Sequence, residues 1–182
     1  MRTVWMVTMW MAAIIAAVAV FVLPAITSTT SPKGVVERFA KMDAEGVRLT
    51  PEGWHEADAL FVKSSEPFQP TVIVIIAPSY QISTMTGGPD TTVYVGYEEV
   101  GKVDTASLRF AKISNGFMKE FDTYTVVSTA ARGWKIDGGQ PKAMHLTAKA
   151  AVRYVEQKRA ATSDLQVKKN ADETLKRLAQ FK

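Results

Sequence analysis

Residues 91–103 read TTVYVGYEEVGKV, and their side chains alternate in character along the chain. In an extended backbone the apolar members fall on one face, namely Val93, Val95 and Tyr97. The other face carries Thr92, Tyr94 and Gly96. This period of two is typical of a strand with one buried side, so the stretch predicts the central element of a sheet.

Further strands are expected on both sides of this segment. Residues 71–76 (TVIVII) are β-branched throughout, which favours a strand over a helix. The other expected strands cover residues 80–85, 108–113, 117–129 and 134–137. Turn signals separate them at residues 87–90, 114–116 and 138–139. Since no crossover helix is expected between the strands, the pattern predicts an antiparallel sheet.

Helices are predicted at both ends of the strand region. Ser31-Pro32 and Thr50-Pro51 are helix-start signals, and Gly46 is a plausible end of the first helix. Thr147 begins a later helix, and Asn170 with Glu173 has the spacing of a capping box for the last one. The expected fold class is therefore α+β, with N-terminal helices packed on a curved antiparallel β-sheet and C-terminal helices added.

The charge distribution divides the 182 residues into three parts. Residues 1–30 are an apolar leader, residues 31–155 are the expected domain, and residues 156–182 are a basic helical tail. Residues 33–155 contain 14 basic and 14 acidic side chains, whereas residues 156–182 contain 7 basic and 4 acidic ones. The overall charge of +4 is thus not a property of the domain, which disfavours nucleic acid as a partner.

The leader predicts export. Val4–Leu23 is interrupted only by Thr8 and is long enough to cross a bilayer as a helix. It could be a cleaved signal peptide or an uncleaved transmembrane anchor, because Leu23-Pro24-Ala25 also offers a cleavage point. In both cases the N-terminus stays in the cytoplasm and the rest is periplasmic or secreted, either released or held in the inner membrane.

Composition excludes several kinds of site. The chain has no cysteine, which removes disulfides, thiol nucleophiles and thiolate metal sites. With only two histidines, His55 and His145, we expect no metal site and no cofactor.

Two sequence patterns resemble the nuclear transport factor 2-like (NTF2-like, SnoaL-like) superfamily. The first is Ser31-Pro32-x-x-Val35-Val36-x-x-Phe39-x-x-Met42-Asp43-x-x-Gly46-x-x-Leu49-Thr50-x-x-x-Trp54, and the second is Gly133-Trp134-Lys135-Ile136-Asp137-Gly138. The resemblance covers about residues 31–145. It implies an exported bacterial α+β cone in which the sheet wraps around the helices and encloses a ligand-binding pocket. Such folds host isomerases, dehydratases, binding modules and assembly subunits, and the fold does not choose among them.

The resemblance suggests where site residues would lie, although no catalytic motif of the family matches. An isomerase of this fold needs an acid or base in an apolar cone, and Asp43 and His55 are the candidates. Candidate ligand-binding residues are Tyr80, Tyr94, Tyr97, Trp134 and His145. For Asp43 the alternative is a pair with Arg48, for Trp134 it is core packing, and for His145 a local hydrogen bond.

The function expected from these observations is a non-catalytic module that binds a small apolar ligand or a protein partner, including a second copy of itself. Two alternatives stay open. One is a cofactor-free isomerase or dehydratase that uses a pocket Asp or His. The other is a membrane-anchored assembly or scaffold subunit, whose membrane contact would be the uncleaved leader.

Overall fold

The computed structural model describes residues 31–65, 67–69, 73–87, 90–113, 118–129 and 133–181. The leader at residues 1–30, and with it the choice between signal peptide and anchor, lies outside the described residues. Within the described ranges, every helix is too short or too polar to cross a bilayer.

The N-terminal helices begin where the sequence predicts. In α1 (Pro32–Ala44) the Ser31 hydroxyl accepts a hydrogen bond from the Gly34 amide, at 3.0 Å. The helix stops before Gly46, whose φ of 76° is the left-handed conformation that glycine adopts without strain. A short 3-10 turn, η1 (Val47–Leu49), leads into α2 (Pro51–Asp58), which Thr50 caps.

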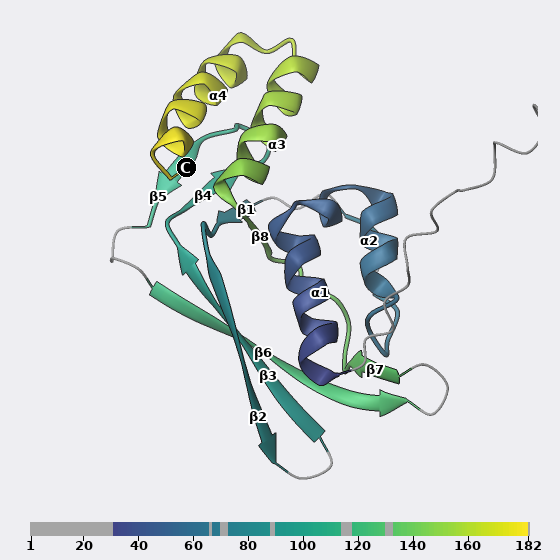
Figure 1. The fold of residues 1–182 in the computed structure, drawn as a ribbon. Coiled ribbons are helices and arrows are strands. Elements are labelled where there is room, and N and C mark those ends of the chain that lie inside the picture. The colour runs from purple at the N-terminus through teal and green to yellow at the C-terminus, as the bar shows by residue number, and fades with distance from the viewer. Residues whose placement is uncertain are drawn as a thin grey trace, which may run out of the picture.

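The first sheet is antiparallel with strand order β2-β3-β6-β7. Its strands are β2 (Tyr80–Gly87), β3 (Asp90–Glu99), β6 (Met118–Thr129) and β7 (Gly133–Ile136). The alternation predicted for β3 is confirmed, because Val93, Val95 and Tyr97 are buried. They face α1 and α2, which lie across one side of this sheet (Figure 1). One core therefore fills the space between these helices and the sheet.

The second sheet has strand order β5-β4-β1-β8 and corrects the expectation of a purely antiparallel arrangement. Its strands are β1 (Ile73–Ile76), β4 (Gly101–Asp104), β5 (Phe110–Lys112) and β8 (Met144–Leu146). β1 and β8 pair in parallel, with Ile75 opposite His145. The connection between them contains β2–β7, that is, all of the first sheet and two strands of the second, and no helix among its described residues. A sequence pattern of strand, helix and strand therefore could not indicate this parallel pair.

The segment 91–103, expected as one strand, is two strands in different sheets. β3 ends at Glu99 and β4 begins at Gly101, and the Val100 amide between them bonds to the Ile76 carbonyl at 2.9 Å. The strand expected at 108–113 is also shorter, since Leu108 has a φ of 55° and closes a turn onto Asp104.

The C-terminal helices cover the second sheet. α3 (Ala148–Ala161) starts from Thr147 as predicted, but α4 (Leu165–Leu178) starts from Asp164 and not from Asn170. Asn170 instead donates to the Ser107 carbonyl at 2.9 Å, and the Thr174 hydroxyl donates to the Leu108 carbonyl at 2.7 Å. The expected domain boundary at 155/156 falls inside α3.

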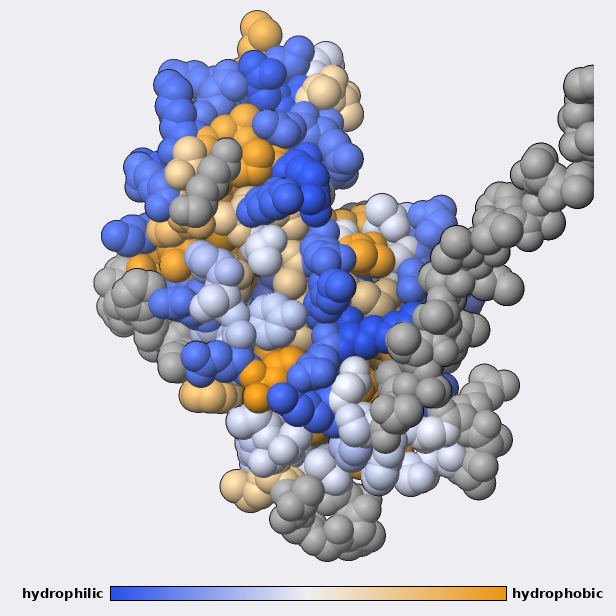
Figure 2. All heavy atoms as spheres, viewed as in Figure 1, coloured by the Kyte–Doolittle hydropathy of each residue, from blue (hydrophilic) through white to orange (hydrophobic). Residues whose placement is uncertain are grey.

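A second core lies between this helix pair and the second sheet. It contains Val74, Val103 and Leu146 from the strands and Val155, Ala171 and Leu178 from the helices. Figure 2 shows hydrophilic side chains over most of the visible face of the helix pair, with an apolar patch between α3 and α4. The 3-10 turn η2 (Ala179–Phe181) ends the described chain.

Gly53 provides a test of how closely η1 packs on α2. A Cβ at this position would lie 1.9 Å from the Val47 carbonyl oxygen. Alanine favours a helix interior by up to about 1 kcal/mol over glycine, but a clash with backbone outweighs that gain. We expect Gly53→Ala to lower the free energy of unfolding by about 3 kcal/mol in urea titrations.

Gly139→Ala is the matched control. A Cβ there meets nothing closer than the Ser65 hydroxyl at 3.6 Å, so its stability should stay within about 0.5 kcal/mol of wild type. Equal stability of the two variants would contradict the packing described for η1.

Candidate functional site

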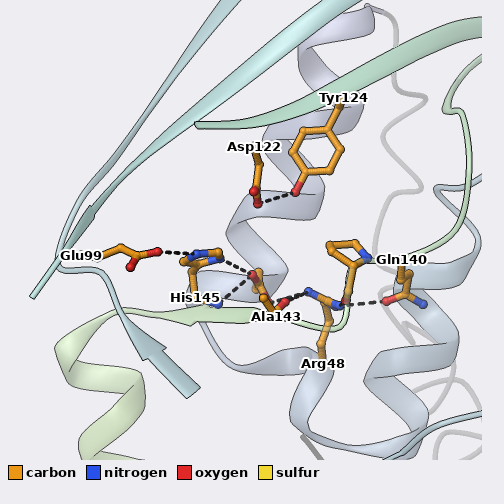
Figure 3. A network of polar contacts seen from close by, with 9 residues as sticks. Arg48, Glu99, Asp122, Tyr124, Gln140, Ala143 and His145 are labelled. Atoms are coloured by element: carbon orange, nitrogen blue, oxygen red, sulfur yellow. Dashed lines mark hydrogen bonds and ion pairs between the residues drawn. The ribbon is translucent and has the colours of Figure 1, made fainter. Parts of the chain in front are cut away.

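Five buried polar residues meet where the two sheets and α1 come together (Figure 3). They are Asp43, Arg48, Glu99, Gln140 and His145, and we call them the Arg48 network. They come from the end of α1, from η1, from the end of β3, from the loop after β7 and from β8. Such a group is stable in a protein interior only if its charges and hydrogen bonds are satisfied.

Arg48 is the centre of this network and has no exposed surface. Its Nη1 donates to Asp43 Oδ1 at 2.8 Å, and its Nε donates to Gln140 Oε1 at 3.0 Å. The guanidinium also donates to the carbonyls of Pro141 and Ala143. The Phe39 and Trp54 rings lie 4.8 and 5.1 Å from its central carbon. The Arg48 guanidinium thus holds the loop 140–143 against η1 and α2.

His145 lies between two carboxylates. Its Nε2 is 3.2 Å from Glu99 Oε1, and its Nδ1 is 3.6 Å from Asp43 Oδ2. Asp43 Oδ2 also accepts the His145 backbone amide at 2.9 Å. Burial lowers the pKa of His145, but the hydrogen bond and charge of Asp43, with contributions from Asp122 and Glu99, outweigh burial and raise it. The geometry therefore favours the protonated form of His145. Its positive charge and that of Arg48 then balance the two carboxylates of Asp43 and Glu99.

Two tyrosines lie beside the network on the inner face of the first sheet. The Tyr97 ring stacks on the His145 ring, with centroids 3.7 Å apart and planes 5° from parallel. The Tyr124 hydroxyl donates to Asp122 at 3.1 Å. Among the described atoms, the buried Tyr97 hydroxyl has no hydrogen-bond partner. Burial raises the pKa of both tyrosines well above 10, so both stay neutral.

A groove opens on the other side of the network, between α2 with its following loop and the second sheet. Its volume is about 800 Å³. We call it the α2–β1 groove, and it is lined by Trp54, Lys63, Ser64, Ser65, Pro67, Gln69, Ile73, Ile75, Lys102, Gly139, Gln140, Lys142 and Ala143. Trp54, Gln140 and Ala143 also contact Arg48, so the network is the support behind the groove wall.

The loop that follows α2 is held in place by Asp58. Its carboxylate accepts from the Ser64 hydroxyl at 2.8 Å, the Ser65 amide at 2.7 Å and Gln140 Nε2 at 3.3 Å. Partial burial raises the pKa of Asp58, but these hydrogen bonds outweigh that effect and lower it. Gln140 Nε2 also donates to the Trp54 carbonyl at 2.8 Å, which joins the loop 140–143 to α2.

The residues that the sequence singled out are distributed over different places. Asp43 and His145 belong to the Arg48 network, and Tyr97 stacks on it. Tyr80 lies 6.1 Å from Tyr97 between ring centroids. Trp134 is half-buried against the first core.

Like Tyr80 and Trp134, the predicted site residues Tyr94 and His55 belong to neither the network nor the groove lining. Tyr94 stands at a β3 position between buried Val93 and Val95, so it lies on the opposite face of the sheet. His55 is exposed on α2. Among the described residues, no group of three His, Cys, Asp or Glu side chains could hold a metal ion.

Sequence reasoning weighed Arg48 only as a partner of Asp43, and it missed Glu99, Gln140 and the groove. Local patterns carry no signal for them, because the partners are far apart in the chain. A charged residue in a short loop, such as Arg48, reads as solvent-exposed unless its long-range partners are known.

The comparisons with known proteins give no relative: no protein-family model, no curated protein and no solved structure matches this chain.

Replacing Arg48 tests whether the network stabilises the fold. Arg48→Met would leave Asp43 and Gln140 buried without their partner, so we expect the free energy of unfolding to fall by about 3–5 kcal/mol. Arg38→Met is the control, because Arg38 forms a 3.3 Å pair with Glu56 that is 32% and 58% exposed. It should cost less than about 1 kcal/mol. Equal losses in urea titrations would contradict the role given to Arg48.

The raised pKa of His145 predicts a pH dependence of stability. Protonation of His145 is favoured in the folded state relative to an unfolded histidine with a pKa near 6.5. The stabilisation is therefore complete below about pH 6.5 and is lost as the pH rises through the folded-state pKa. Urea titrations from pH 5 to 9 should show this loss.

His145→Gln should remove that fall in stability, whereas the exposed His55→Gln should retain it. A pH profile of His145→Gln that parallels wild type would show that His145 does not carry the effect.

Proposed function

We propose that the protein is an exported, non-catalytic module that binds a small ligand through apolar contacts in the α2–β1 groove. The observation that carries the proposal is the groove itself. Its volume of about 800 Å³ lies in the range of small-molecule sites, and Trp54, Ile73 and Ile75 supply apolar surface. Ser64, Ser65 and Gln140 add a few polar groups that could orient a ligand.

The Arg48 network behind the groove wall favours a site that is already formed before a ligand binds. The Trp54 ring is held by the Arg48 guanidinium at 5.1 Å and by an edge contact to Phe68 at 6.1 Å between ring centroids. Gln140 is fixed by hydrogen bonds to Arg48, Trp54 and Asp58. A wall that is already ordered loses little conformational entropy when a ligand binds.

The charge arrangement supports binding rather than acid–base catalysis. Both ring nitrogens of His145 face carboxylates, and Asp43 is paired with Arg48. These groups are paired with one another and lie behind the groove wall. The described residues that line the groove include no Asp, Glu or His.

The proposal includes membership of the nuclear transport factor 2-like superfamily and its cone-shaped fold. Its support is the packing of α1 and α2 on one face of a four-stranded antiparallel sheet, together with the two sequence patterns given above. Export is proposed from the apolar leader at residues 1–30 alone.

A neutral aromatic probe tests the proposed function. Titration calorimetry of the full chain with 2-naphthalenemethanol should show saturable binding. Ala143→Phe places a large ring at an exposed position on the groove wall and should weaken binding at least about tenfold. Ala160→Phe, at an exposed position on α3, should bind as wild type does. No saturable binding by wild type, or equal binding by both variants, would overturn the proposal.

A further inference from the structure

The edge strands of the two sheets are protected to different degrees. β7 is covered by residues 60–62, because both the amide and the carbonyl of Ile136 bond to this segment at 2.9 Å. β8 is covered by the end of α1, where Asp43 accepts the His145 amide. β5 is only three residues long and contains Lys112. Covered, short or charged edges resist pairing with another chain.

β2 is the fourth edge strand, and it has none of these protections within the described part of the chain. Its eight residues, Tyr80–Gly87, contain no charged side chain and no proline. Among the described strands, β3 is its only pairing partner. Figure 1 shows β2 at the margin of the first sheet. Its outer side is therefore a long, uncharged edge that is open to a further strand.

The pairing with β3 shows which backbone groups of β2 point outward. The Glu98 amide bonds to the Ser79 carbonyl at 3.1 Å, and the β2–β3 register continues from this pair. Bonded and non-bonded pairs alternate in an antiparallel ladder, so the odd-numbered residues of β2 bond to β3. The amides and carbonyls of Tyr80, Ile82 and Thr84 therefore point away from the sheet.

A second copy of β2 fits this edge. When the two strands run antiparallel about a two-fold axis, the register that engages most of the outward groups sets Ile82 against Thr84 of the second copy and Ser83 against Ser83. Since β2 carries no charge, no like charges meet along this ladder. The other edge of the same sheet, β7, is covered, so the pairing ends at two copies.

The charges on α1 also suit a second copy. Lys33, Glu37, Lys41 and Glu45 alternate in sign along its exposed side, with ion pairs of 3.2 and 4.0 Å between neighbours. Burial, together with the charges of Glu45 and Glu37, raises the pKa of Tyr80, so these carboxylates lie near the start of β2. A two-fold axis reverses the direction of α1 in the second copy, which sets basic positions toward acidic ones.

We propose that two copies of the protein form a dimer by antiparallel pairing of β2 with β2, which joins their first sheets into one continuous sheet. The pairing satisfies the outward backbone groups of both edges. It also covers Tyr80 and Ile82, which are half-buried at the margin of the first core. β2 does not line the α2–β1 groove, so this proposal is independent of the proposed function.

A charge at Ser83 tests the pairing. Ser83 is exposed, and Ser83→Lys places two lysines opposite each other across the two-fold axis. Sedimentation equilibrium of the full chain in a density-matched detergent should show a wild-type dimer and a Kd for dimerisation at least about tenfold higher for Ser83→Lys. Thr123→Lys is the matched control, because Thr123 is exposed on β6 away from this edge. It should dimerise as wild type does.

A mixture of two variants separates a specific charge effect from loss of folding. Ser83→Glu alone should weaken the dimer as Ser83→Lys does, whereas an equimolar mixture of the two should restore it, because opposite charges then face each other. The chain has no cysteine, so Ser83→Cys gives a second readout. Oxidation should link two copies of Ser83→Cys through a disulfide, and Thr123→Cys should stay unlinked.

Four outcomes would overturn the proposal. A monomeric wild type would leave β2 without a second copy, and a dimer that Ser83→Lys does not weaken would form through another part of the chain. Equal weakening by Thr123→Lys would move the contact from the edge to the outer face of the sheet. Failure of the Lys and Glu variants to dimerise together, although each unfolds in urea as wild type does, would contradict the predicted register.

Discussion

The buried ion pair between Arg48 and Asp43 is the contact on which the rest of the structure depends. A guanidinium without exposed surface is tolerated only because a carboxylate, an amide oxygen and two backbone carbonyls accept hydrogen bonds from it. Those acceptors lie on α1 and on the loop 140–143. The ion pair therefore sets the position of that loop relative to α1 and, through it, the position of β8.

The groove is a consequence of this polar core. Gln140 and Ala143 reach the groove wall because Arg48 holds their loop, and Trp54 keeps its position because its ring lies against the same guanidinium. The buried side of the wall is charged and closed, whereas its exposed side is apolar with lysines around it. The loop 140–143 thus joins a buried charged network on one side to an open groove on the other.

The sequence predicted elements where the signal is local. Caps at Ser31, Thr50 and Thr147 lie within three residues of the amides that they bind, so a short window contains the whole interaction. The burial of alternate β3 residues was predictable for the same reason. The Arg48 network was not, because Gln140 and His145 lie 92 and 102 residues from their partners Arg48 and Asp43. β8 is three residues long, too short for a period of two to appear.

The parallel pairing of β1 with β8 has a consequence for folding order. One edge of β1, the most apolar strand, has its partner at residues 144–146, so the second sheet is complete only when nearly the whole chain is available. Contacts of such long range are formed slowly, because the intervening chain must be ordered first. During synthesis, the run Ile73–Ile76 is an aggregation-prone segment that must be kept from pairing with other chains until residues 144–146 are available to form β8.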